Sequence, residues 1–146
     1  METSIEETYL QAFKGKFTST MRWSQLDEFW CLLRAQADDG WYVYAVGETP
    51  PQQPVTKSQL LKFIDEIDAL LHREHDEDYC GIVYIDNQQH PEYIKIFDPN
   101  NLGVTCGFSE KPPLPGWVLS RIKPVELESA LYPTKNRQRW WQKIFK

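Results

Sequence analysis

The second half of the chain is a series of short strand-like runs joined by connections too short to contain a helix. Residues 81–85 form an apolar run, and residues 93–97 place Ile94 and Ile96 on one side and Lys95 on the other. Residues 104–108 and 117–122 are two further predicted strands. Parallel neighbours need a crossover connection of about a dozen residues or more. These late strands are therefore predicted to pair antiparallel.

Apolar residues at helical spacing predict three helices. The start of each helix carries a pair of residues at capping-box spacing. The capping pairs are Ser4 with Glu7, Ser24 with Asp27, and Thr56 with Gln59. The first helix is expected to end near Gly15, and the second carries an apolar stripe from Leu26 to Ala37. The third helix is predicted to be the longest, over residues 57–73.

Residues 41–47 are apolar or aromatic at nearly every position, which predicts a strand in the middle of a sheet. Together the elements predict an α+β fold with a mostly antiparallel four- or five-stranded sheet and two to three helices packed on one face. We expect residues 1–134 to form a single α+β domain. Residues 135–146 are predicted to be a basic amphipathic C-terminal tail, either part of that domain or a docking element.

The composition narrows the class of protein and its compartment. The chain has 146 residues, of which 41% are hydrophobic and 25% charged, as in a globular protein. It has no apolar run near the ~20 residues that a spanning helix needs, so we expect no integral membrane association. The N-terminus is acidic and lacks an apolar leader segment, so no secretory signal is predicted. Three widely spaced cysteines favour free thiols in a reducing cytoplasm.

Charge is distributed unevenly along the chain. The formal net charge is −5, which disfavours binding to nucleic acid. Residues 129–146 hold five basic side chains and no acidic one. All 21 acidic side chains therefore lie in residues 1–128, together with the remaining 11 of the 16 basic ones. Such asymmetry often marks an interaction element.

The C-terminal tail has the pattern of a short amphipathic helix. Its apolar side chains fall within an arc of about 140° at helical spacing, and most of its basic side chains lie opposite. A helix this short is marginal in water, so it needs a surface to pack against. That surface is the acidic body of the same chain, a partner protein or, less favourably, a lipid membrane. The predicted interaction residues are Arg137, Arg139, Trp140, Trp141, Lys143, Ile144 and Phe145.

Residues 72–80 gather side chains that can bind a metal ion. His72 and His75 are three residues apart at the end of the third predicted helix, and Asp76 or Cys80 could complete the set. The pattern is not His-Glu-x-x-His, and a solvated acidic helix end explains the same residues. No cofactor or metal is therefore expected in the main interpretation.

Two cysteines are candidates for a catalytic nucleophile. Cys80 begins a strand and Cys106 follows a turn, where His90 and Asp98 could act as base and orienting group. Nothing in the spacing requires this arrangement, and buried cysteines in strands are mostly inert packing residues. The sequence also lacks a phosphate-binding glycine loop and a nucleophile elbow.

These observations favour a small non-enzymatic cytoplasmic protein that acts by protein–protein interaction. An accessory, inhibitor or immunity-type factor with an unidentified protein partner has this character. One alternative is a metal- or thiol-dependent enzyme centred on His72, His75 and Cys80 or on Cys106. The other is a small-ligand binding domain with a pocket between the sheet and the helices.

Overall fold

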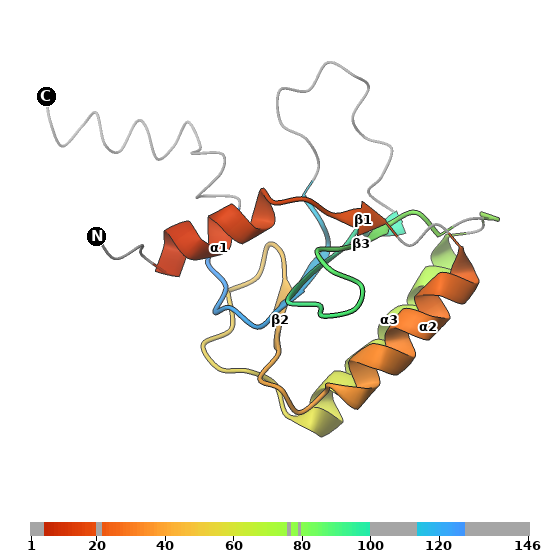
Figure 1. The fold of residues 1–146 in the computed structure, drawn as a ribbon, viewed down its shortest axis with the longest axis horizontal. Coiled ribbons are helices and arrows are strands. Elements are labelled where there is room, and N and C mark those ends of the chain that lie inside the picture. Colours follow the sequence, from red (N-terminus) through yellow and green to blue (C-terminus); the bar gives the residue numbers. More distant parts are fainter. Residues whose placement is uncertain (1–4, 20–21, 76, 79, 100–113, 128–146) are drawn as a thin grey trace, which may run out of the picture.

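The computed structural model describes residues 5–19, 22–75, 77–78, 80–99 and 114–127, and it places three helices and five strands in them (Figure 1). The helices are α1 (Ile5–Phe13), α2 (Trp23–Ala35) and α3 (Lys57–Glu74). The strands are β1 (Thr18–Ser19), β2 (Tyr42–Ala45), β3 (Val83–Ile85), β4 (Tyr93–Ile96) and β5 (Trp117–Ser120). The predicted α+β class is confirmed, and the predicted strand over residues 104–108 lies outside the described residues.

The strands form one sheet in the order β1-β3-β4-β5-β2, and every neighbouring pair is antiparallel. In the middle of the sheet, Ile94 on β4 pairs with Ile85 on β3 and with Leu119 on β5. All three side chains are fully buried. The antiparallel pairing predicted from the short connections is therefore confirmed for β3 and β4.

Strand β2 lies at an edge of the sheet, so the central position predicted for residues 41–47 is wrong. Both faces of this edge strand are nevertheless covered, because Val43 packs against one apolar cluster and Tyr44 belongs to another. The segment after β2 also returns to its start, where the backbone N–H of Val55 donates to the carbonyl of Trp41 at 2.8 Å. A continuously apolar strand therefore indicates that both of its faces are covered by side chains. It does not indicate that the strand has a neighbouring strand on each side.

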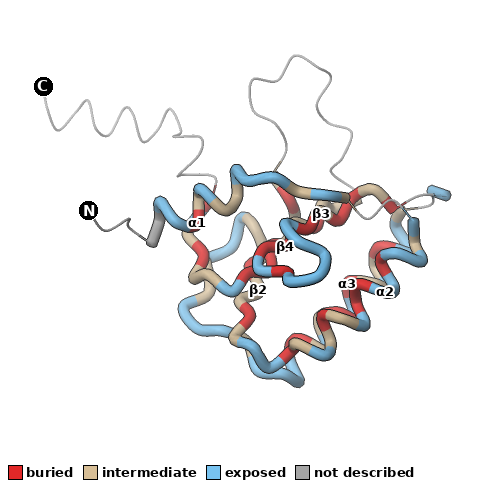
Figure 2. The backbone as a smooth tube through the Cα atoms, viewed as in Figure 1, coloured by how far each residue is buried: buried red, intermediate tan, exposed pale blue. Residues whose placement is uncertain are grey.

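Helices α2 and α3 cover one face of the sheet, and the main core lies between them and the strands. Figure 2 shows buried positions recurring along α2 and α3. On α3 the buried side chains repeat every three or four residues, which places them on one stripe. The stripe consists of Leu60, Ile64, Ile67 and Leu71. It meets the side chains of Val83, Ile85, Ile94, Ile96 and Leu119 from the sheet.

Helix α1 packs on the opposite face of the sheet. Side chains alternate across a strand, so Tyr44, Tyr93 and Val118 point away from the main core. They form a second buried cluster with Tyr9 of α1. The ring centroids of Tyr9 and Tyr93 are 5.2 Å apart. Two helices thus share the predicted face, and the third covers the other one.

The start of α3 follows its predicted cap. The Thr56 side-chain oxygen accepts a hydrogen bond from the backbone N–H of Gln59 at 3.2 Å. In return, the backbone N–H of Thr56 donates to Oε1 of Gln59 at 2.9 Å. These two bonds satisfy amides that have no partner inside the helix. The predicted capping box is confirmed.

The start of α2 differs from its predicted cap. The helix begins at Trp23, before Ser24, so the cap predicted from Ser24 and Asp27 is wrong. Instead, Oε1 of Gln25 accepts a hydrogen bond from the backbone N–H of Arg22 at 3.0 Å. Asp27 therefore lies inside the helix rather than serving as part of its cap, and its carboxylate is available to neighbouring side chains.

Candidate functional site

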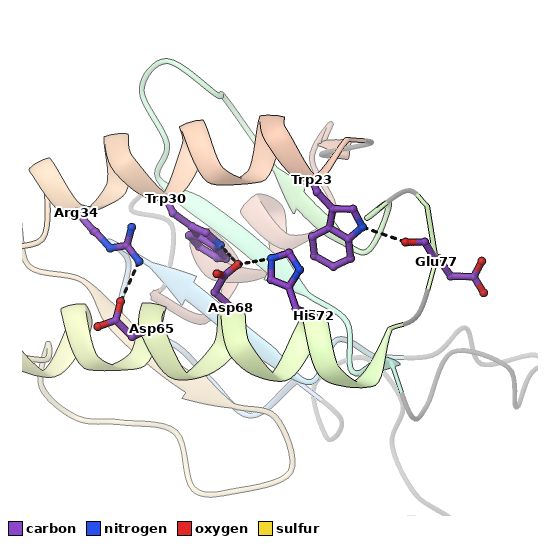
Figure 3. Close-up of polar contacts among 7 residues, drawn as sticks. All are labelled: Trp23, Trp30, Arg34, Asp65, Asp68, His72 and Glu77. Carbon is purple, nitrogen blue, oxygen red and sulfur yellow. Dashed lines mark hydrogen bonds and ion pairs between the residues drawn. The ribbon is translucent and has the colours of Figure 1, made fainter.

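A row of polar and aromatic side chains lies along the seam between α2 and α3, which we call the α2–α3 seam (Figure 3). Residues three and four positions apart on a helix project from the same side. This spacing brings Asp65, Asp68 and His72 of α3 to face α2. The α2 residues of the seam are Trp23, Asp27, Trp30 and Arg34.

Asp68 occupies the middle of the α2–α3 seam. Its Oδ1 accepts a hydrogen bond from the indole N–H of Trp30 at 3.0 Å. The same oxygen lies 3.4 Å from Nε2 of His72, one helical turn further along α3. Trp30 is 1% exposed, so its indole N–H depends on a protein acceptor. Asp68 thus joins a buried tryptophan to an exposed histidine.

The His72 ring is held by a tryptophan from α2. Trp23 stacks on it with ring centroids 4.2 Å apart and an angle of 26° between the planes. The indole N–H of Trp23 in turn donates to the backbone carbonyl of Glu77 at 3.0 Å. Figure 3 shows this chain of contacts from Glu77 through Trp23 to His72 and Asp68. The imidazole therefore has a fixed plane despite its exposure.

Asp27 completes a group of three possible metal ligands. One ligand atom each from Asp27, Asp68 and His72 lies within 4.8 Å of the other two. Two carboxylates and one imidazole provide oxygen and nitrogen donors, which suit divalent cations. The group draws on two helices, so a ligand bound there would contact α2 and α3 together.

The residues predicted from the sequence as a metal site separate in the structure. His72 joins Asp68, whereas Nε2 of His75 lies 2.9 Å from the backbone carbonyl of Cys80. Cys80 is 2% exposed and belongs to the main core. Asp76 lies outside the described residues.

The predicted thiol and tail residues fall only partly within the described chain. Cys106 lies outside it, as do all seven interaction residues predicted in the C-terminal tail. His90 is exposed in the connection between β3 and β4, and Asp98 follows β4. The proposed Cys106 arrangement and the tail surface remain predictions.

A shallow groove of about 190 Å³ runs beside α3, on the side away from the seam. Phe63, Leu70 and Trp117 contribute half-buried apolar surface, with Glu66 and Arg73 at its border. An apolar centre with a charged border is the composition of many protein–protein contact surfaces. A second hollow, of about 370 Å³, lies at the end of β2 and β5 rather than between the sheet and the helices.

Only part of the α2–α3 seam can be predicted from the sequence. Asp68 and His72 are four residues apart on a predicted helix, a spacing that can place two ligands together. That spacing is therefore a local signal for the pair. Asp27 and Trp30 belong to another helix, and no local pattern connects them with His72.

The chain matches no protein-family model, no curated protein and no solved structure. Among the described residues, no helix has the length and apolar character needed to cross a membrane.

Proposed function

We propose that this protein is a non-enzymatic domain that acts by binding another protein through its C-terminal tail, residues 135–146. The observation that carries the proposal is charge segregation: residues 129–146 hold five basic side chains and all 21 acidic ones precede them. On the helix predicted in the tail, the aromatic side chains share one arc and most of the basic side chains lie opposite it. Tryptophan and arginine are the residues most often found at energetic centres of interfaces.

The chemistry of the tail specifies the kind of partner. Its apolar arc requires a groove that accepts Trp140 and Trp141, and its basic arc favours an acidic border. The partner is therefore an acidic protein surface that receives one short helix. The half-buried groove beside α3 is a second surface of suitable composition on the described body.

Free thiols on the described body support the cytoplasm as the proposed location. Cys31 is an exposed free cysteine on α2, and Cys80 is a buried one. Exposed thiols persist where the compartment keeps them reduced. Localisation of a tagged full-length chain tests this part of the proposal.

The test compares recovery of a stoichiometric partner by the full chain and by a Trp140→Ala/Trp141→Ala variant. We expect the partner to be lost with the variant while the melting temperature stays unchanged. Recovery should also fall in about 1 M salt, where the Debye length is about 3 Å. A variant with Lys57→Ala and Lys62→Ala removes two exposed charges from α3 and serves as the control.

Three results would overturn the proposal. A lower melting temperature for the tail variant means that the tail packs on its own body. Partner recovery that survives the tail variant but is lost with Leu70→Glu places the contact in the groove beside α3. Equal loss in the Lys57→Ala/Lys62→Ala control shows a non-specific charge effect.

A further inference from the structure

We propose that Asp27, Asp68 and His72 form a binding site for a first-row divalent cation of the Zn²⁺ class. The site is independent of the proposed protein-binding function, because it lies on the α2–α3 seam of the described body. It also differs from the set His72, His75 and Cys80 suggested by the sequence. Only His72 is common to the two.

The distances among the three ligands suit a small cation. Zinc bonds of about 2.0–2.1 Å in tetrahedral geometry place neighbouring ligand atoms about 3.3 Å apart. Nε2 of His72 and Oδ1 of Asp68 are already 3.4 Å apart. Asp27 brings all three ligand atoms within 4.8 Å of one another, and its exposed side chain can close the remaining distance by a rotamer change.

Two tryptophans hold the ligands in place. The Trp30 indole N–H donates to Asp68 at 3.0 Å, and Trp23 stacks on the His72 ring at 4.2 Å. Metal ligands are commonly oriented by hydrogen-bond donors and acceptors just behind them. The Trp30 bond has that role for the carboxylate, and the Trp23 stack fixes the plane of the imidazole. The side chains of Asp68 and His72 therefore need little further ordering when a metal ion binds.

Neighbouring cationic side chains are engaged elsewhere. Arg34 pairs with Asp65 at 2.9 Å, and Arg73 pairs with Glu74 at 3.2 Å. Within the described chain, the Asp27 carboxylate has no hydrogen-bond or ion-pair partner. Two carboxylates beside one imidazole therefore present negative charge that a divalent cation would neutralise.

The donor set selects the class of cation. Carboxylates alone favour Mg²⁺, Ca²⁺ or Mn²⁺, whereas an imidazole nitrogen favours Zn²⁺ and its first-row neighbours. Three protein ligands leave a fourth tetrahedral position for water or for a donor from another molecule. The proposed site is therefore open on its solvent side.

The test is calorimetric titration of the full chain with zinc chloride. We expect one saturable equivalent, and a weakening of about tenfold or more in Asp27→Asn and in His72→Gln. Asp27→Asn is the decisive variant, because no contact of that side chain in the described fold would be lost. Paramagnetic Co²⁺ provides a second readout, since it should broaden the indole N–H resonances of Trp23 and Trp30 before those of other tryptophans.

Matched controls carry the same chemistry elsewhere on the surface. Asp38→Asn removes an exposed carboxylate just beyond the end of α2, away from the seam, and His90→Gln removes an exposed imidazole. Both should bind zinc like the unaltered chain. Binding no tighter than about 1 mM would overturn the proposal. So would equal weakening in the controls, or weakening in His75→Gln and Cys80→Ala while Asp27→Asn binds normally.

Discussion

At the scale of single residues, Lys95 has the least expected surroundings. It projects from β4 toward α1, and its Nζ lies 3.9 Å from the ring centroid of Phe13 and 4.0 Å from that of Phe17. Aromatic faces attract a cation. Burial acts in the opposite sense and lowers the pKa of Lys95 from 10.5 to about 8, because the charged form loses water.

This lowered pKa predicts a stability that rises with pH. Above pH 8 the folded chain loses the Lys95 proton, whereas the unfolded chain keeps it until about 10.5. The unfolded state then binds more protons, so the free energy of unfolding should increase between those values. Urea denaturation from about pH 7.5 to 9.5 measures the increase, and Lys95→Met should remove it.

The upper end of that range is set by two tyrosines. Burial raises the pKa of Tyr9 and of Tyr93 above the ordinary value of 10.0. Both hydroxyls remain protonated in the folded chain when the unfolded chain has lost those protons, so stability falls again above about pH 10. A wild-type curve that is flat below that point, or an equal rise in Lys95→Met, would contradict the role given to Lys95.

At the scale of elements, the contact between α2 and α3 combines one buried and one exposed polar pair. Asp68 accepts the indole N–H of buried Trp30, whereas Asp65 pairs with Arg34 at the surface. Hydrogen-bond partners of buried groups contribute more than exposed ion pairs, because a lost partner leaves a desolvated donor.

Replacing each acid in turn should show this difference. Asp68→Ala is expected to lower the free energy of unfolding by about 1–3 kcal/mol, since it orphans the Trp30 indole. Asp65→Ala should lower the free energy of unfolding by no more than about 1 kcal/mol, because the ion pair of Asp65 with Arg34 is exposed to water. Denaturant titration compares them, and Asp68→Asn, which keeps an acceptor oxygen, should recover part of the loss. Equal effects of the two alanine variants would refute this ranking.

Local sequence determines where a helix begins and ends more closely than it determines which face of the sheet the helix packs on. The apolar stripe and the Thr56 cap predicted residues 57–73, and α3 spans Lys57–Glu74. The same periodicity could not place α1, because its partners Tyr44 and Tyr93 are distant in sequence. The candidate metal site was likewise not predictable from local sequence alone, because its ligands come from two helices. His72 was recognisable as a ligand, whereas Asp27 reaches it only through the packing of two helices.

At the scale of the whole molecule, the order of strands sets where the fold opens first. Among the described strands, β4 has neighbours on both sides, while β1 has two residues and pairs with β3 alone. Local opening is easiest where few buried contacts and few ladder bonds must break. The sheet should therefore be most stable around β4 and least stable at β1.

Native-state hydrogen exchange tests this gradient. Backbone amides of β4 are expected to exchange only by global unfolding, with protection matching the free energy from denaturant titration. The hydrogen-bonded amides of β1 should exchange by local opening, at rates that depend little on denaturant. Protection in β1 equal to that in β4 would show that the edge opens only with the whole sheet.

The close approach of the backbone at Gly116 to Asp98 bears on how this fold tolerates a change in the length of the chain. A Cβ at Gly116 would lie only 3.1 Å from Cβ of Asp98, and the Gly116 amide donates to the carbonyl of Ile96 at 2.9 Å. The chain thus leaves β4 and enters β5 at adjoining points. Doubling the length of a loop adds only about 0.6 kcal/mol to the free energy of closing it. A connection whose two ends adjoin can therefore lengthen at small cost, whereas a side chain at position 116 would require Asp98 to shift by a few tenths of an ångström.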